Sequence, residues 1–284
     1  MTKHKATAIG FSAVLMWSLL ALLTIGSAPV PPLLLNALCF GIGGVLGLVW
    51  TARRGFHVLR AISWKVYAFG TAGLFSYHLL YFTAFRLGPD ATTGLIAYLW
   101  PLFIVLLSGM LPGEKLRLPH VLGALIALGG AAVIVLGTRT ESGGANFVAL
   151  GLAFLCALTW AGYSVLSRRL GGVPTESVTV FCLATAALSG LAHLALEETV
   201  WPEGFAGWAS VAALGLGPVG AAFFAWDIGM KRGDIQLLGV ASYAAPLLST
   251  VVLVGAGITQ PSWAIALAAV MITAGATLAA LSGS

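Results

Sequence analysis

The sequence predicts an all-α membrane protein with ten transmembrane helices, arranged as two five-helix repeats of inverted topology. The prediction rests on a very apolar composition, on long stretches without charged residues, and on a match between the two halves of the chain. Of the 284 residues, 59% are hydrophobic and 8% are charged, whereas soluble domains have roughly 25% charged residues. So few charges cannot cover the surface of a soluble globule, and we expect a lipid bilayer around the chain.

Eight stretches of the chain contain no Asp, Glu, Lys or Arg. They are 6–52, 66–85, 91–113, 118–138, 142–167, 177–196, 204–226 and 235–284. A membrane-spanning helix needs about 20 such residues, so six stretches are single spans and the first and last are double. Helix-ending residues interrupt the double stretches at 26–32 and 255–261. The total is ten helices joined by short loops, with no room for a soluble domain.

Basic residues divide unequally between alternate loops, and this division indicates the orientation. With the N-terminus inside, twelve Lys and Arg residues fall inside and only Arg86 and Arg139 fall outside. Basic residues favour the cytoplasmic side, so we expect both termini in the cytoplasm, in a bacterial inner membrane, and the acidic loop 197–204 outside. The net charge of +5 is then a topology signal, because nucleic-acid binding needs basic residues clustered on one solvent face.

The two halves match when the chain is shifted by 145 residues. Residues 88–102 then show five identities, which pair Gly88, Gly94, Tyr98, Pro101 and Leu102 with Gly233, Gly239, Tyr243, Pro246 and Leu247. Five helices per half is an odd number, so the second half enters the membrane from the opposite side, as in many transporters. This predicts repeats over 1–140 and 141–284, with coincidence between apolar segments as the alternative.

Each repeat places a glycine, a tyrosine and a proline on one helix face: Gly94, Tyr98 and Pro101, and Gly239, Tyr243 and Pro246. A proline within a span frees a carbonyl group and bends the helix. Irregular backbone in a membrane lies against protein or a wet cavity. We therefore expect the prolines and glycines to act as hinges near the midplane, with simple packing kinks as the alternative.

Eight Trp and Tyr residues fall well inside the predicted spans: Trp17, Tyr77, Tyr81, Tyr98, Trp100, Trp160, Tyr163 and Tyr243. A phenol hydroxyl in hydrocarbon needs a hydrogen-bonding partner. Five such tyrosines on four predicted helices favour a shared wet cavity lined by aromatic rings, and scattered structural tyrosines are the alternative. Trp residues near span ends, such as Trp64 and Trp263, are expected at the membrane interface.

His78 lies in the middle of the third predicted helix, on one face with Tyr81 and Phe82. An ionisable group inside a membrane is a candidate for function, and an imidazole can bond to a substrate amino or carboxyl group. A structural histidine bonded across helices is the alternative. Asp227 stands one turn before Lys231, which favours a local ion pair over a proton relay.

Sequence motifs for metal binding and nucleotide hydrolysis are absent: there is no HExxH, no CxxC and no Walker-type loop. Cys39, Cys156 and Cys182 are expected to be packing residues. We therefore expect no metal, no cofactor and no enzyme activity. An intramembrane hydrolase using Ser189 and His193 is a remote alternative, and a wet helix end explains His193 and Glu197 better.

Three segments, 91–103, 111–116 and 123–130, resemble the EamA family of the drug/metabolite transporter superfamily. Pro101, Glu114, Gly123 and Gly129 fall on its proline in helix 4, its glutamate in the following cytoplasmic loop and its glycine-rich helix 5. The second half departs from this pattern, because Thr259 and Gln260 stand where a second glutamate is expected.

The resemblance implies an inner-membrane transporter that exports amino acids, aromatic ones first, by alternating access. The residues themselves support a wet, aromatic and uncharged cavity between the halves, since no Lys or Arg falls inside a predicted span. Export of toxic cationic or lipophilic metabolites is the alternative. The expected partners are an amino acid and the lipid bilayer, with no nucleic acid, and the oligomeric state stays open, a monomer being one option. Candidate substrate-binding residues are His78, Tyr77, Tyr81, Tyr98, Trp100, Trp160, Tyr163, Tyr243 and Trp17.

Overall fold

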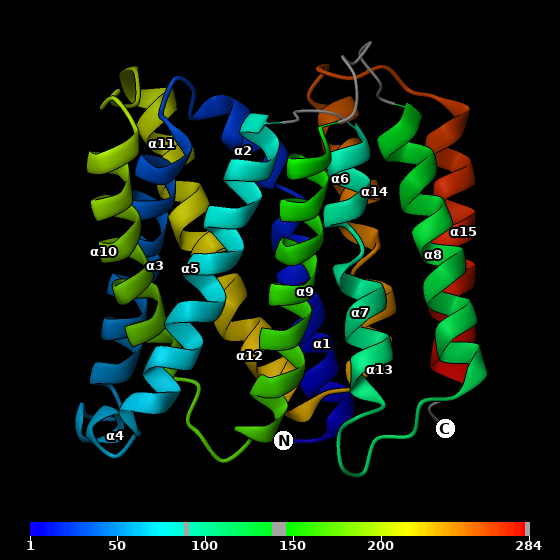
Figure 1. Ribbon diagram of the computed structural model, residues 1–284, viewed down its shortest axis with the longest axis horizontal. Coiled ribbons are helices and arrows are strands. Elements are labelled where there is room, and N and C mark those ends of the chain that lie inside the picture. Colours follow the sequence, from blue (N-terminus) through cyan, green and yellow to red (C-terminus); the bar gives the residue numbers. More distant parts are fainter. Residues whose placement is uncertain (88–90, 138–145, 282–284) are drawn as a thin grey trace.

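The computed structural model describes residues 1–87, 91–137 and 146–281, and within these ranges all regular elements are helices. Gly88, Arg139 and the expected repeat boundary at 140 lie outside the described residues. Figure 1 shows the longer helices running along one common direction. Their bounds are α1 (Lys3–Trp17), α2 (Leu20–Gly26), α3 (Pro32–Ala52), α4 (His57–Arg60), α5 (Trp64–Leu87), α6 (Ala91–Ala97), α7 (Trp100–Ser108), α8 (Leu118–Gly137), α9 (Phe147–Arg169), α10 (Ser177–Leu196), α11 (Gly204–Leu216), the π-helical η1 (Gly217–Ala221), α12 (Ala222–Arg232), α13 (Ile235–Ala241), α14 (Ala244–Gly255) and α15 (Trp263–Leu281).

Among the residues that the structure describes, eight helical segments are long and apolar enough to cross a membrane, which makes this a multi-pass membrane protein. Helix α5 is not among them although it has 24 residues. Its lysine, histidine, arginine and tyrosines make it less apolar than its neighbours. The α6–α7 segment is apolar but shorter, at Thr93–Ser108. The count of ten spans therefore stays a prediction.

Four long segments are interrupted partway along their length. Helix α6 ends before Tyr98 and Leu99, and α13 ends before Ser242 and Tyr243. Each interruption lies a few residues before a proline, because proline has no N–H for the carbonyl one turn earlier. The other two interruptions, between α1 and α2 and at η1, were not predicted from the sequence.

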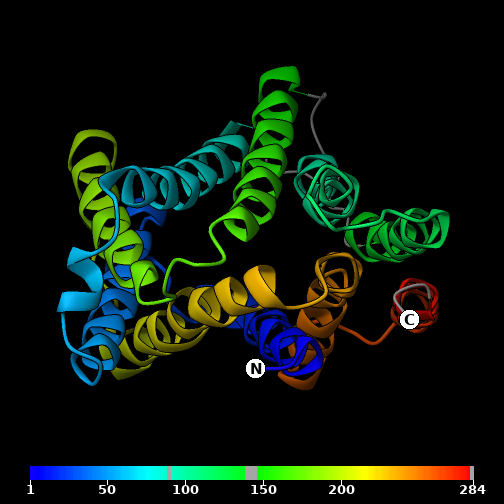
Figure 2. The same ribbon diagram turned by 90° about the horizontal axis from the view of Figure 1, so that it is seen from below.

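Helix pairs from different parts of the chain pack side by side. The most extensive contacts join α8 with α15, α3 with α10, α5 with α9, and α1 with α12. Figure 2 shows α8 and α15 together at one edge, while α5, α9 and α12 surround the middle. Both continuous and interrupted segments therefore contribute to the centre of the protein.

Both ends of the chain lie at one end of the bundle. Helix α1 begins there and α15 ends there, at the bottom of Figure 1. We call this the N-terminal end. The α4 segment and the loops that follow α7 and α9 lie at the same end, so most of the basic residues gather there. The loop that follows α10 lies at the opposite end.

Candidate functional site

Four tryptophans from four helices meet at the centre of the bundle and form what we call the tryptophan cluster. Trp17 is the last residue of α1 and Trp100 the first of α7, while Trp160 lies in α9 and Trp226 in α12. All six pairs of rings are in contact, with centroid distances from 5.1 to 6.4 Å. Most pairs meet edge to face or tilted, the geometry that aromatic quadrupoles favour.

The interruptions in the helices help to position these rings. The indole N–H of Trp17, just before the interruption between α1 and α2, donates to the carbonyl oxygen of Pro218 in η1 at 3.0 Å. The indole N–H of Trp226 donates to Ser164 Oγ at 3.0 Å. Two of the four indole N–H groups are therefore satisfied inside the protein, as buried indoles require.

Trp226 was not among the residues predicted from the sequence. It is the last residue of the charge-free stretch 204–226 and directly precedes Asp227. In the structure α12 continues to Arg232, because the carboxylate of Asp227 pairs with Lys231 at 2.9 Å one turn later. This confirms the predicted local pair. The spacing of Asp227 and Lys231 is the sequence signal that could have predicted the buried position of Trp226, because it allows both charges to be paired within the helix.

Helix α5 adds a second group of rings to the cluster. The Tyr77 ring lies 5.1 Å from Trp160 and 6.1 Å from Tyr81, and Tyr163 lies 5.4 Å from Trp160. Tyr98 lies in the interruption between α6 and α7. Seven of the nine predicted site residues are therefore joined by ring contacts, namely Trp17, Tyr77, His78, Tyr81, Trp100, Trp160 and Tyr163.

The hydrogen bond of His78 determines which ring nitrogen carries its proton. Nδ1 lies 2.7 Å from the carbonyl oxygen of Leu74, one turn earlier in the same helix. A carbonyl can only accept, so Nδ1 is the donor, and in the neutral ring Nε2 is left as an acceptor. The ring also meets Phe40 edge to face at 4.9 Å. His78 is thus held by its own helix, and its Nε2 can accept a hydrogen bond from a ligand.

Tyr243 does not join the aromatic rings at the centre. It is fully buried in a second hydrophobic group with Val105 and Leu247. Its hydroxyl oxygen accepts a hydrogen bond from the backbone N–H of Leu102 at 3.1 Å. Tyr243 was predicted to line the shared cavity. In the structure its hydroxyl instead bonds to the backbone of α7.

The central rings differ in how much accessible surface they keep. Trp100 is 7% exposed, Trp160 is 3% exposed and Trp226 is 1% exposed. Trp17, Tyr77, His78, Tyr81 and Tyr98 are only partly buried. Accessible surface therefore remains on the part of the site that α5 contributes, while the other tryptophans are packed against one another.

The two predicted hinge glycines differ in their surroundings. A methyl group on Gly239 would lie 2.9 Å from Val105 Cγ2 and 3.2 Å from the carbonyl oxygen of Pro101. A methyl group on Gly94 would meet ordinary contacts, the nearest at 3.6 Å. Gly239 thus allows α13 to approach α7 closely, whereas a side-chain methyl group at Gly94 would be accommodated.

A group of charged and polar side chains, which we call the outer ion-pair cluster, closes the end opposite the N-terminal end. The carboxylate of Glu197 accepts hydrogen bonds from the Leu33 and Leu34 N–H groups at 3.0–3.2 Å, at the start of α3. It also binds His193 Nδ1 at 2.9 Å and the guanidinium of Arg86. The cluster therefore joins α3, α5 and α10.

The expected wet helix end at His193 and Glu197 is wrong. Their side chains are 4% and 2% exposed, because α3 and α5 cover them. Ser189 accepts a hydrogen bond from the Asn36 side chain at 2.7 Å, while His193 bonds to Glu197 and Thr199. Ser189 and His193 thus bond to other residues and not to each other. They do not form the serine–histidine pair that a hydrolase needs.

At the N-terminal end a second group, the inner ion-pair cluster, joins the loop after α7 to α9 and α12. The guanidinium of Arg168 pairs with Glu114 and also donates to the carbonyl oxygens of Met230 at 2.8 Å and Gly233 at 3.0 Å. Each end of the bundle therefore has one arginine–glutamate pair, Arg86–Glu197 at one end and Arg168–Glu114 at the other.

Asp234 ties the start of α1 to the start of α13 at this same end. Its carboxylate pairs with Lys3 at 2.7 Å and accepts the Leu237 N–H at 2.9 Å, as an N-cap. Burial alone would raise the pKa of Asp234, but the hydrogen bonds from Lys3 and Leu237 and the charge of Lys3 hold it below its usual value. The charged form is thus the one that the fold stabilises.

In the described part of the chain, no three His, Cys, Asp or Glu side chains come together as a metal site would require. Cys39, Cys156 and Cys182 are free thiols buried among helices. The chemistry available at the centre is therefore that of aromatic rings, tyrosine hydroxyls, one imidazole and the free backbone groups of interrupted helices.

Interrupted helices that meet around a central site, with contacts between helices closing both ends, define a membrane transporter. The chain belongs to the EamA-like transporter family, whose model matches residues 4–136 and again residues 147–281. The predicted family resemblance is confirmed.

Three relatives show how closely the whole chain follows known proteins. It is 54% identical to the "Aromatic amino acid exporter YddG" of Ancylobacter novellus, over 99% of both chains. It is 28% identical to the protein of the same name from Salmonella typhimurium, over 88% of both chains. A solved crystal structure that is 54% identical matches with a TM-score of 0.93, covering 98% of this chain and 96% of the other.

Proposed function

We propose that this transporter exports amino acids, aromatic ones first, and that the tryptophan cluster is its substrate site. The observation that carries the proposal is the mutual contact of four tryptophans from four helices at the centre of the bundle. The printed names of the relatives with 54% and 28% identity support the same substrate class. Tyr77, Tyr81, Tyr163 and His78 complete the wall of the site.

The chemistry of the site suits each part of an aromatic amino acid. The substrate ring replaces the contacts that the indoles now make with one another, each aromatic pair contributing about 0.5–1.5 kcal/mol. Its ammonium group can lie over a ring face, and this cation–π contact contributes roughly 0.5–2 kcal/mol to binding. The ammonium group can also donate a hydrogen bond to Nε2 of His78. The hydroxyl groups of Tyr77 and Tyr81 can donate to the carboxylate.

Alternating access follows from the two closed ends. Opening the outer end requires Arg86 and Glu197 to separate, and opening the inner end requires Arg168 and Glu114 to separate. Pro101 and Pro246 with Gly94 and Gly239 are the hinges that we propose for these movements, since α6–α7 and α13–α14 are interrupted beside the prolines.

For the architecture we propose ten spans in two inverted repeats, 1–140 and 141–284. Adding α5 and α6–α7 to the eight long apolar segments gives ten. The separate matches of one family model to the two halves support a duplication. The paired interruptions near Pro101 and Pro246 support it as well.

We propose that the N-terminal end faces the cytoplasm of a bacterial inner membrane, because the basic residues gather there. A single cysteine in loop 197–204, in a background without Cys39, Cys156 and Cys182, tests this. It should react with an impermeant reagent in intact cells. Labelling that appears only after lysis would overturn the orientation.

Transport by this route needs no cofactor and no enzyme activity. All rings of the site come from one chain, so we propose that a monomer is sufficient for transport. The substrate and the lipid bilayer are the only partners that the mechanism requires, and nucleic acid has no role in it.

Counterflow of labelled tryptophan into proteoliposomes tests the proposed function. Trp160→Ala removes a ring of the site, while Trp263→Ala removes an indole that is 75% exposed on the outside of the bundle. We expect rapid exchange by the wild type and by Trp263→Ala, and a loss of roughly tenfold or more in tryptophan affinity in Trp160→Ala.

The substrate range separates the proposal from its alternative. Truncation of Trp160 should weaken tryptophan and phenylalanine more than threonine and alanine, because only the first two lose ring contacts. Transport of lipophilic cations without amino-acid exchange would favour a toxin exporter. Equal shifts for all four amino acids, or none, would remove the tryptophan cluster as the substrate site.

A further inference from the structure

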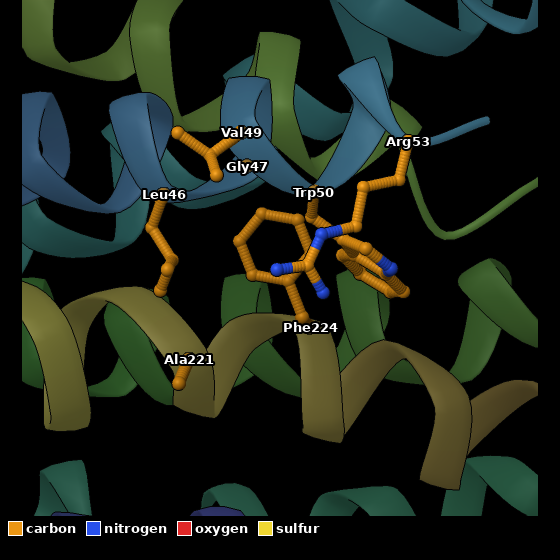
Figure 3. Close-up of a pocket in the computed structure, with 7 residues that line it drawn as sticks. All are labelled: Leu46, Gly47, Val49, Trp50, Arg53, Ala221 and Phe224. Carbon is orange, nitrogen blue, oxygen red and sulfur yellow. The ribbon is translucent and has the colours of Figure 1, made fainter. Parts of the chain in front are cut away.

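A pocket of about 300 Å³ opens on the side of the bundle between α3 and α12, away from the candidate substrate site. It is lined by Leu46, Gly47, Val49, Trp50, Arg53, Ala221 and Phe224. Figure 3 shows α3 along one wall and the η1–α12 segment along the other. None of the predicted substrate-binding residues lines it, so this pocket needs an explanation of its own.

The packing of two glycines explains where the pocket lies. A methyl group on Gly43 of α3 would lie 2.8 Å from the Cα atom of Gly220 in η1, so the two backbones touch at this point. One turn further along α3, at Leu46 and Gly47, the pocket begins. The rings of Trp50 and Phe224 form its far part, edge to face at 5.3 Å.

The pocket faces the surroundings of the bundle rather than its centre. Val49 on its rim is 56% exposed, whereas Phe224 at its base is 6% exposed. In a membrane protein such an outward surface is covered by lipid. Its apolar walls and exposed rim therefore fit an acyl chain better than a polar solute.

Arg53 gives the pocket a positive charge at the N-terminal end. Figure 3 shows its guanidinium reaching over the rings of Trp50 and Phe224. In the described part of the chain Arg53 has no carboxylate partner, while the neighbouring Arg54 pairs with Glu176 at 2.8 Å. An arginine without a counter-ion at the membrane surface favours a phosphate, which it can bind through two N–H groups.

We propose that this pocket binds an anionic phospholipid, with its phosphate on Arg53 and an acyl chain between α3 and α12. The charges are complementary, because anionic lipids gather in the cytoplasmic leaflet and basic pockets between transmembrane helices bind their head groups. The occupied leaflet depends on the orientation proposed above, but binding itself does not depend on the transported substrate. The lipid rests against η1 and Phe224, on the segment that also carries Trp226.

Native mass spectrometry of the purified full chain in detergent tests the proposal. The protein is titrated with phosphatidylglycerol, with phosphatidylcholine and with sn-glycerol 3-phosphate, and lipid adducts are counted while the melting temperature is followed. We expect phosphatidylglycerol to bind about tenfold more tightly than phosphatidylcholine, and sn-glycerol 3-phosphate to neither bind nor stabilise.

Arg53→Gln and Arg60→Gln form a matched pair, since each removes one positive charge from the same end. Arg53→Gln should bring phosphatidylglycerol affinity down to the level of phosphatidylcholine, while Arg60→Gln should change it less than twofold. Ala221→Phe, and Val49→Trp on the exposed rim, should fill the groove and weaken both lipids.

Equal losses in Arg53→Gln and Arg60→Gln would show only a general attraction of charge and would overturn the site. Unchanged lipid binding in folded Val49→Trp would overturn the groove. Binding of sn-glycerol 3-phosphate as tightly as the lipid would show that the acyl chain has no part in recognition. Each of these results leaves the test of amino-acid transport untouched.

Discussion

The hydroxyl oxygen of Tyr243 accepts a hydrogen bond from the backbone N–H of Leu102 at 3.1 Å. Leu102 is the third residue of α7, and the interruption before α7 leaves its N–H without a partner inside the helix. A side chain from the second half of the chain thus satisfies a backbone group that an interruption in the first half has freed. This bond links the two interrupted segments α6–α7 and α13–α14.

Tyr243→Phe removes this bond and leaves a buried N–H without a partner. We expect the free energy of unfolding to fall by about 1–3 kcal/mol, measured as a shift in denaturant-induced unfolding in detergent. Tyr163→Phe is the control, because the Tyr163 hydroxyl makes no hydrogen bond within the described ranges. If both variants lose the same stability, the bond to Leu102 is not what makes Tyr243 important.

His78→Phe keeps the edge-to-face contact with Phe40 and removes the acceptor Nε2. If this nitrogen binds the substrate ammonium, affinity should fall by roughly 2- to 13-fold, the equivalent of about 0.5–1.5 kcal/mol. The loss should be equal for tryptophan, phenylalanine, threonine and alanine, because all four carry the ammonium group. Competition curves normalised to folded protein measure it. Unchanged affinities together with a lower folded yield would assign His78 a purely structural role.

Arg86→Gln and Arg168→Gln should shift the protein between its two access states in opposite directions. Both arginines pair with a glutamate across helices, at opposite ends of the bundle. A cysteine in place of Tyr81, in a background without the native cysteines, reports access from the outer end. Arg86→Gln should speed its labelling several-fold and Arg168→Gln should slow it. Equal rates in both variants would mean that these pairs do not control access.

The stability that Asp234 contributes should depend on pH in a definite direction. Its pKa is lowered in the folded protein, so its carboxylate stabilises the fold above the unfolded-state value of about 3.9. This contribution is lost as the pH falls below that value and through the folded pKa. Asp234→Asn keeps the N-cap and should cost about 0.5 kcal/mol at pH 7, whereas Asp234→Ala should cost about 1–2 kcal/mol.

Thermal unfolding between pH 3 and 7 measures the effect of Asp234. The difference between the wild type and Asp234→Asn should be largest at neutral pH and should shrink below about pH 4. A difference that grows on acidification has the wrong sign and would contradict the stabilised carboxylate.

Pro101→Ala and Pro246→Ala test the hinges. Alanine restores an N–H that can bond to the carbonyl one turn earlier, at Ala97 or Ser242, so both segments should become straighter and the exchange rate should fall. Folded yield should change little, since alanine favours helix. Pro119→Ala, in the first turn of α8, is the control. Full rates in both hinge variants would make the prolines packing features.

Much of the fold could be predicted because a bilayer imposes strong constraints on sequence. Stretches without charge must be helical there, and the long helices follow the predicted stretches. Trp17, Trp100 and Trp160 lie well inside their charge-free stretches, so their central positions could also be predicted. Trp226 was not predicted, although the charge of the adjacent Asp227 is paired with Lys231 inside the helix.

Contacts between distant segments could not be predicted in the same way. The burial of Glu197 depends on Arg86 and on the start of α3, more than a hundred residues away in each case. No proline follows Trp17 closely, so the interruption there could not be predicted from the sequence. Composition identifies aromatic residues, but it does not show which central rings pack against one another and which keep accessible surface.

The tryptophan cluster gives the protein an optical signal of its own conformation. Four indoles within 6.4 Å of one another couple their electronic transitions, and near-ultraviolet circular dichroism is sensitive to such fixed packing. Any step that separates these rings must change that spectrum and the emission of the cluster. The opening of the site can therefore be followed in the unlabelled protein, without adding a dye.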